Sequence, residues 1–131
     1  MPMFNNAAQI ASIGFAPAAG AANVCDVVMT VKDKAGRTIK GPHELDIWLS
    51  DAATGLGITG TTASGTVTAK SASGTVLTAL TAKKHIRAQT LATGLFTLEI
   101  TDTAKTTFYV CAKIDGLPVQ VSAILATGNY G

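Results

Sequence analysis

The sequence has little of what most enzyme sites are built from. It contains two histidines and two cysteines, and only 14% of its residues are charged. Neither His43 nor His85 stands at the close spacing of zinc ligands, so the sequence predicts no metal site. It has no Gly-x-Ser-x-Gly motif and no phosphate-binding loop, and four of its acidic residues fall in predicted turns: Asp33, Asp51, Asp102 and Asp115. We therefore predict that the protein is not an enzyme and uses no cofactor.

Long apolar runs and strong charge are also lacking. No apolar segment reaches the length of about 18 residues that a membrane span needs. The net charge of +2 is small and the basic residues are scattered, so nucleic acid is not an expected partner. The local cluster of Lys83, Lys84 and Arg87 reads as a strand edge protected against aggregation. No basic residue precedes Lys32, which fits a secretory signal poorly, although Ala-Gly-Ala at 19–21 resembles a cleavage site.

The two cysteines leave two interpretations open. Cys25 and Cys111 fall in separate predicted strands and could link the two sheets of a sandwich, as in immunoglobulin domains. The alternative is two reduced thiols in a protein made in a reducing cytosol. Cys111 has the opposite parity from Val110 and Ala112, which look like the core face of their strand. This parity favours two free thiols.

Residues 1–23 are predicted to form an extended N-terminal arm that precedes a single domain at 24–131. The segment shows neither strand alternation nor a helical stripe, and it ends in a Pro-Ala-Ala-Gly-Ala-Ala run. Its apolar residues would be poorly placed in water, which indicates burial on a neighbouring surface or subunit. A flexible terminus is the alternative.

From residue 24 onward, apolar and polar residues alternate in short segments that are typical of strands. The main predicted strands are 24–32, 37–40, 45–49, 84–90, 96–100, 108–114 and 119–125. Turn sequences such as 33–36 separate them, and no helical stripe is present. This pattern predicts an all-β protein, an antiparallel β-sandwich of immunoglobulin-like or related topology with about eight strands.

Two details of the pattern concern the middle of the chain. Trp48 has the opposite parity from Ile47 and Leu49, so it lies either in the second layer of the sandwich or exposed as a contact residue. Its large apolar area favours the core. Ser-Gly-Thr-Val at 64–67 recurs at 73–76, and this short offset predicts the two arms of a hairpin that turns near 71–74.

Four segments carry a likeness to a known group of proteins: Lys-Asp-x-Ala-Gly at 32–36, Leu-Asp-Ile-Trp-Leu-Ser-Asp at 45–51, Thr-x-x-Thr-Gly-x-Phe at 90–96 and Thr-Phe-Tyr-Val at 107–110. Over about residues 24–131 the chain resembles small immunoglobulin-like capsid decoration or cement proteins of tailed bacteriophages. The resemblance implies a virion protein, assembled in the host cytoplasm, that binds the major capsid protein as a homo-oligomer or in many copies and reinforces the shell. Phe4, Ile10, Ile13 and Phe15 of the arm would then be the capsid contacts.

The alternative hypothesis is an immunoglobulin-like binding module of a tail fibre or cell-surface protein, used for carbohydrate or protein adhesion. Sugar binding calls for several aromatic rings that form a flat platform. Trp48, Tyr109 and Tyr130 are few and widely separated in the sequence, so we favour the capsid role.

Overall fold

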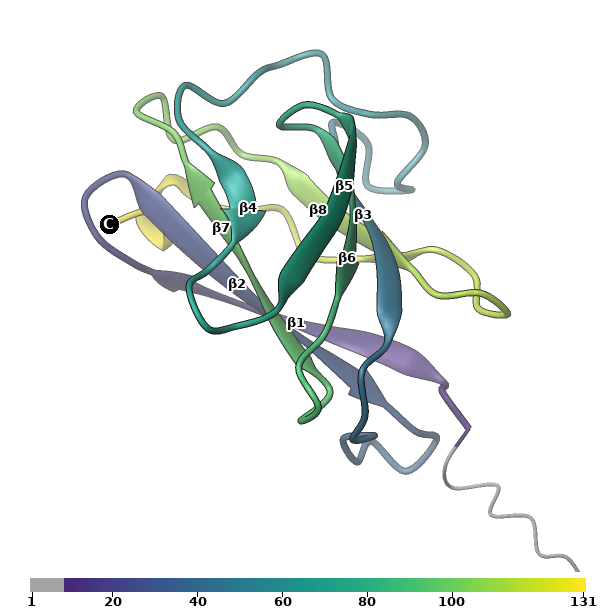
Figure 1. Ribbon diagram of the computed structural model, residues 1–131. Coiled ribbons are helices and arrows are strands. Elements are labelled where there is room, and N and C mark those ends of the chain that lie inside the picture. Colours follow the sequence, from purple (N-terminus) through teal and green to yellow (C-terminus); the bar gives the residue numbers. More distant parts are fainter. Residues whose placement is uncertain (1–8) are drawn as a thin grey trace, which may run out of the picture.

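Two antiparallel sheets make up the computed structural model, which describes residues 9–131 and is 44% strand and 2% helix (Figure 1). The four-stranded sheet has the order β1 (Ser12–Ala19), β2 (Val24–Lys32), β7 (Leu95–Thr101) and β4 (Val67–Ala69). The five-stranded sheet has the order β5 (Thr75–Thr81), β6 (His85–Gln89), β3 (Glu44–Ser50), β8 (Tyr109–Lys113) and β9 (Gln120–Val121). One short 3-10 helix, Thr127–Asn129, precedes the last residues. The predicted all-β antiparallel sandwich is confirmed.

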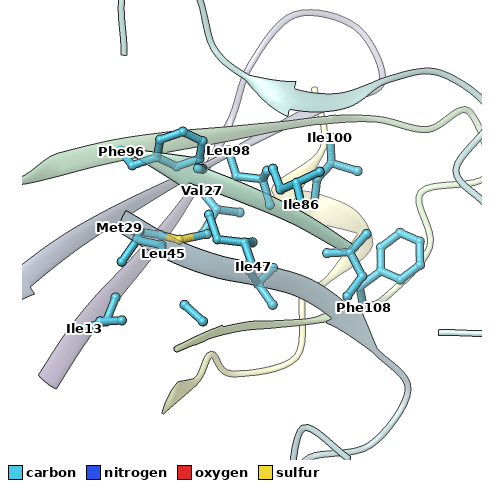
Figure 2. Packing of buried hydrophobic residues seen from close by; sticks show 14 of the residues in the cluster. Ile13, Val27, Met29, Leu45, Ile47, Ile86, Phe96, Leu98, Ile100 and Phe108 are labelled. Atoms are coloured by element: carbon cyan, nitrogen blue, oxygen red, sulfur yellow. The ribbon is translucent and has the colours of Figure 1, made fainter. Parts of the chain in front are cut away.

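The core lies between the two sheets and consists mainly of the apolar positions that alternate in the sequence (Figure 2). Its largest fully buried side chains are Phe96, Phe108, Met29, Leu45, Ile47, Leu49, Leu98 and Ile100. Each such side chain contributes about 1.5–3 kcal/mol when it leaves water. The period of two therefore identified the core face of β2, β3, β7 and β8 correctly.

The chain between β3 and β7 does not form the predicted hairpin. β4 pairs with β7 in the four-stranded sheet, whereas β5 pairs with β6 in the five-stranded sheet. Each Ser-Gly-Thr-Val copy instead brings a glycine close to β7. A Cβ added at Gly65 would lie 2.7 Å from the Thr101 side chain, and one at Gly74 would overlap the Phe96 ring. The repeat thus marks two close approaches to β7, and the hairpin prediction is wrong.

This same path bears on the topology. After β3 the chain enters the four-stranded sheet as β4 before it returns as β5 and β6. An immunoglobulin-like connection of the strands is therefore not confirmed, although both sheets are antiparallel.

Most of the predicted arm belongs to the sandwich. Residues 12–19 form β1, which pairs with β2 from Ser12 opposite Lys32 to Ala19 opposite Cys25. Ile13 is only 5% exposed and lies in the core. An arm outside the domain is thus wrong for these residues, because an edge strand is held by main-chain pairing and needs no strict alternation. The boundary expected after residue 23 falls in the turn between two paired strands.

A buried carboxylate organises the turn after β7. Asp102 is 1% exposed, and its Oδ1 accepts hydrogen bonds from the main-chain N–H groups of Ser64 and Ala104, both at 3.2 Å. Its Oδ2 accepts from the N–H and the hydroxyl of Thr106 at 3.0 and 2.5 Å. The Tyr130 hydroxyl donates to the Thr106 carbonyl at 2.7 Å, so the C-terminal segment closes on the same turn. The turn role predicted for Asp102 is confirmed.

Candidate interaction surface

The outer face of the five-stranded sheet carries two rows of side chains of different character. Strand register aligns the first, which we call the apolar row: Thr81, His85, Trp48, Cys111 and Val121, one from each strand. The second, the charged row, lies two residues away on β6, β3 and β8 and three residues away on β5, where the register shifts: Thr78, Arg87, Asp46 and Lys113. The face therefore has an apolar part and a charged part side by side.

Trp48 lies at the centre of the apolar row. Its indole Nε1 donates a hydrogen bond to the Gly55 carbonyl at 2.9 Å, and its ring meets the His85 ring edge-on at a centroid distance of 5.8 Å. The side chain is half-buried on the outer face, so the expectation that it fills the core is wrong. Its neighbours Ile47 and Leu49 already occupy the core side of β3, and a loop covers part of the indole instead.

That cover is the loop 51–60, which is fixed at several points. The Thr59 N–H donates to the Leu49 carbonyl at 2.7 Å, and the Ser50 hydroxyl donates to the Leu56 carbonyl at 3.3 Å. The Asp51 carboxylate accepts from the Thr59 hydroxyl at 2.5 Å and from the Gly60 N–H at 3.1 Å. These hydrogen bonds, that of Thr59 first, lower the pKa of Asp51. These hydrogen bonds hold the loop in place over the outer face of the sheet.

The loop 51–60 lies over β8 and β9. A Cβ added at Gly55 would lie 3.0 to 3.2 Å from the side chains of Val121, Val119 and Cys111. Cys111 is consequently fully buried beneath the loop, and this burial raises the pKa of its thiol to about 11. Cys25 is buried on the core side of β2, where burial and, to a smaller extent, Asp26 raise its pKa to about 11.

Both thiols are free. Cys111 lies outside the core cluster while Val110 and Ala112 belong to it, so the parity argument is confirmed. The two sulfur atoms lie on opposite sides of the five-stranded sheet, which is why they do not link the sheets.

Exposed apolar side chains gather around this face. Of the seven large apolar residues that are exposed among residues 9–131, five lie beside the apolar row or on the β5 edge of the sheet. We call these five the apolar patch: Leu56, Ile58, Val119, Leu77 and Leu80. Leu56 on the loop is 78% exposed, and Leu80 on β5 is 55% exposed. Exposed apolar side chains that gather on one part of a protein surface mark contact sites between proteins.

Part of the patch surrounds an open hollow of about 320 Å³, lined by Trp48, His85, Val119 and residues 55–58. The Nε2 atom of His85 is buried and has no hydrogen-bond partner among the described residues. Leu77 and Leu80 lie at the two register shifts of β5, which is the edge strand farthest from β8 and β9 and from the loop over them.

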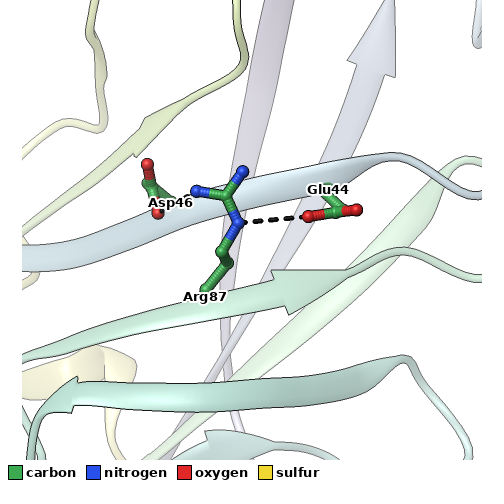
Figure 3. Close-up of polar contacts among 3 residues, drawn as sticks. All are labelled: Glu44, Asp46 and Arg87. Carbon is green, nitrogen blue, oxygen red and sulfur yellow. Dashed lines mark hydrogen bonds and ion pairs between the residues drawn. The ribbon is translucent and has the colours of Figure 1, made fainter.

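The charged row is balanced. Arg87 bonds Glu44 through Nε and Asp46 through Nη1, both at 3.1 Å (Figure 3). Lys113 is the register partner of Asp46 on the other side of β3. Solvent screens these pairs, so they contribute little to stability. The outer face of the four-stranded sheet is different, because its buried Asp26 is paired with Lys70 at 2.6 Å and no exposed large apolar residue is found on its described strands.

The contact residues predicted from the sequence lie elsewhere. Ile13 belongs to the core of its own sandwich, so its side chain is not offered to a partner. Ile10 and Phe15 are partly buried against the core, and Phe4 lies outside the described residues. Sequence reasoning missed the apolar patch; the one local signal was Leu-Gly-Ile at 56–58, two large apolar residues inside a Gly- and Thr-rich loop.

Within residues 9–131 no three His, Cys, Asp or Glu side chains come together in a way that could hold a metal ion. None of the helical segments described is long and apolar enough to span a membrane. Comparison with known proteins gives no match: no family model, no curated protein and no solved structure matches the chain.

Proposed function

We propose that the protein is a structural component of a bacteriophage virion, which binds the outer capsid surface and reinforces the shell. The observation that carries this proposal is the apolar patch, five exposed large apolar side chains beside the apolar row and on the β5 edge of the five-stranded sheet. Such a surface supports a function in binding other proteins. The step from protein binding to a capsid rests on the resemblance of residues 24–131 to decoration proteins.

The surface is suited to broad contact with another protein and not to a small-molecule ligand. The hollow beside Trp48 is open, and its lining offers His85 as the single titratable side chain. A usual small-molecule site instead encloses its ligand and places several polar groups around it. Individually weak contacts hold firmly when many copies engage one lattice. Ile10, which precedes β1, and Phe15 in β1 are both partly exposed, and they are the proposed capsid contacts in the described part of the chain.

The test compares binding to assembled shells with binding to free capsid subunits, using one labelled preparation of the full chain. We expect saturating occupancy at many copies per shell and an apparent affinity at least about tenfold higher than for the isolated subunit. Equal affinity for both forms, or no binding to shells, would overturn the proposal.

One observation favours the alternative, a carbohydrate-binding adhesion module. Trp48 is half-buried beside an open hollow and next to the His85 ring, an arrangement that can stack a sugar ring. Trp48 is the single tryptophan, so its fluorescence reports binding at this position directly. Saturable quenching by one oligosaccharide in a glycan screen, without binding to shells, would replace the capsid function by adhesion.

A further inference from the structure

We propose that a second copy of this chain covers the apolar patch. The two five-stranded sheets then stack face to face around a two-fold axis that runs along the strands, between β3 and β6. This pairing goes beyond the proposed function, because it assigns the apolar patch to contact between copies and leaves Ile10 and Phe15 as the proposed capsid contacts. Three properties of the outer face support it: its shape, the order of its charges and its area.

The shape of the outer face allows two copies to fit together, because one half of the face is raised and the other half is low. The loop 51–60 raises the half of the face over β8 and β9, where Gly55 approaches Val121 and Cys111, whereas β5 lies at the far edge of the sheet from this contact. A two-fold axis between β3 and β6 brings β8 of one copy above β5 of the other, so each raised half meets a low half. Leu56 and Ile58 of one copy then approach Leu77 and Leu80 of the second, and both sets of exposed side chains leave water.

The order of charges agrees with the same axis. Asp46 on β3 lies opposite Arg87 of the second copy, and the symmetry repeats this pair in the other direction. Arg87 uses two of its five donors within its own chain, on Glu44 and Asp46, and therefore has donors left for the second copy (Figure 3). Asp46 lies between Arg87 and Lys113 in the charged row, so each copy offers both an acid and a base near the axis.

The same pairing also covers the apolar row. Trp48 of one copy lies opposite His85 of the other, since both belong to one register row on neighbouring strands. The hollow beside Trp48, with its lone buried His85 Nε2, is thereby closed by protein.

The area of the face sets the strength of the pairing. With the axis between β3 and β6, four strands of each copy overlap, and strands about 4.8 Å apart and roughly 20 Å long then give about 400 Å² per copy, or about 800 Å² in total. Interfaces of this size are weak and transient. We therefore expect a dimer with a dissociation constant in the micromolar range, which is reinforced when copies are concentrated on a lattice.

Sedimentation velocity of the full chain over a concentration series tests the pairing without any capsid. We expect a reversible monomer–dimer equilibrium whose dissociation constant rises at least about tenfold in Leu56→Asp. The matched control is Leu91→Asp, which changes an exposed leucine in the turn between β6 and β7 and should leave the equilibrium unchanged. A wild-type chain that stays monomeric to several hundred micromolar (roughly 50-fold above the expected constant), or a dimer indifferent to Leu56→Asp, overturns the inference.

A charge exchange tests the axis itself. Asp46→Arg and Arg87→Asp should each be monomeric alone, because each places like charges opposite one another across the axis. An equal mixture should dimerise again, since the two new pairs are then complementary. Thermal melts of each variant confirm that it is folded, and failure of the mixture to dimerise rejects this axis. Dimers that do not bind shells would disprove the capsid function alone, whereas monomers that bind shells would disprove the pairing alone.

Discussion

Replacing Asp102 by Asn should destabilise the sandwich strongly, although the two side chains have the same shape. Asn keeps one oxygen for the Ser64 and Ala104 N–H groups, but its NH₂ group then faces the Thr106 N–H, which loses its acceptor. A hydrogen bond to a buried charged group contributes about 1.5–3 kcal/mol, and a buried donor without a partner costs a further about 1–3 kcal/mol. Allowing for partial relaxation, we expect the free energy of unfolding to fall by about 2–4 kcal/mol and Tm by roughly 6–15 °C.

Urea denaturation followed by Trp48 fluorescence measures this loss at pH 7. The control is Asp115→Asn, in the turn between β8 and β9, where the carboxylate is exposed and a change within about 0.5 kcal/mol is expected. A loss below about 1 kcal/mol for Asp102→Asn would refute the assigned role of the carboxylate.

The pH dependence provides an independent check. Burial on its own would raise the pKa of Asp102, but hydrogen bonds from Thr106, Ser64 and Ala104 outweigh it and lower the pKa. A carboxyl with a lowered pKa in the folded state stabilises fully above its unfolded pKa of about 3.9, and this stabilisation disappears as the pH falls through the folded pKa. The difference between wild type and Asp102→Asn should therefore be constant from about pH 7 to 5 and narrow below about pH 4. A gap that stays unchanged on acidification would contradict the argument.

Two further predictions follow from the backbone and the thiols. Gly94 and Gly116 both have positive φ, +83° and +90°, but a Cβ at Gly94 would overlap the Ile39 carbonyl while one at Gly116 meets nothing within 4 Å. Thermal melts should thus show a loss of about 1–2 kcal/mol for Gly116→Ala and at least about 3 kcal/mol for Gly94→Ala, and similar losses would contradict this reading. Because burial raises the pKa of both Cys25 and Cys111 to about 11, native protein at about pH 8 should react slowly with a thiol reagent, and unfolded, non-reduced protein should show two thiols. Fast reaction of the native protein, or a count of zero, would contradict it.

The sequence by itself determined the strand content and the core face of most strands. Alternation along β2, β3, β7 and β8 is a local property, because successive side chains of a strand point to opposite sides whatever the strand pairs with. It therefore identified Met29, Ile47, Leu98 and Val110 as core residues, and it placed Cys111 on the other side of its strand.

Only the tertiary structure decided which strands share a sheet and what covers each outer face. Pairing joins main chains that are far apart in sequence, so a residue such as Val27 in β2 carries no local mark of its partner Leu98 in β7. In the same way, the two Ser-Gly-Thr-Val copies have the same local sequence but lead into different sheets, because β4 pairs with β7 and β5 pairs with β6. The core position predicted for Trp48 was wrong because the loop 51–60 covers its indole on the outer face. That loop is held by hydrogen bonds such as the one from Thr59 to Asp51, and the alternation of apolar and polar residues does not predict such bonds. The apolar patch depends on that fixed loop, and so it is visible only once the chain is folded.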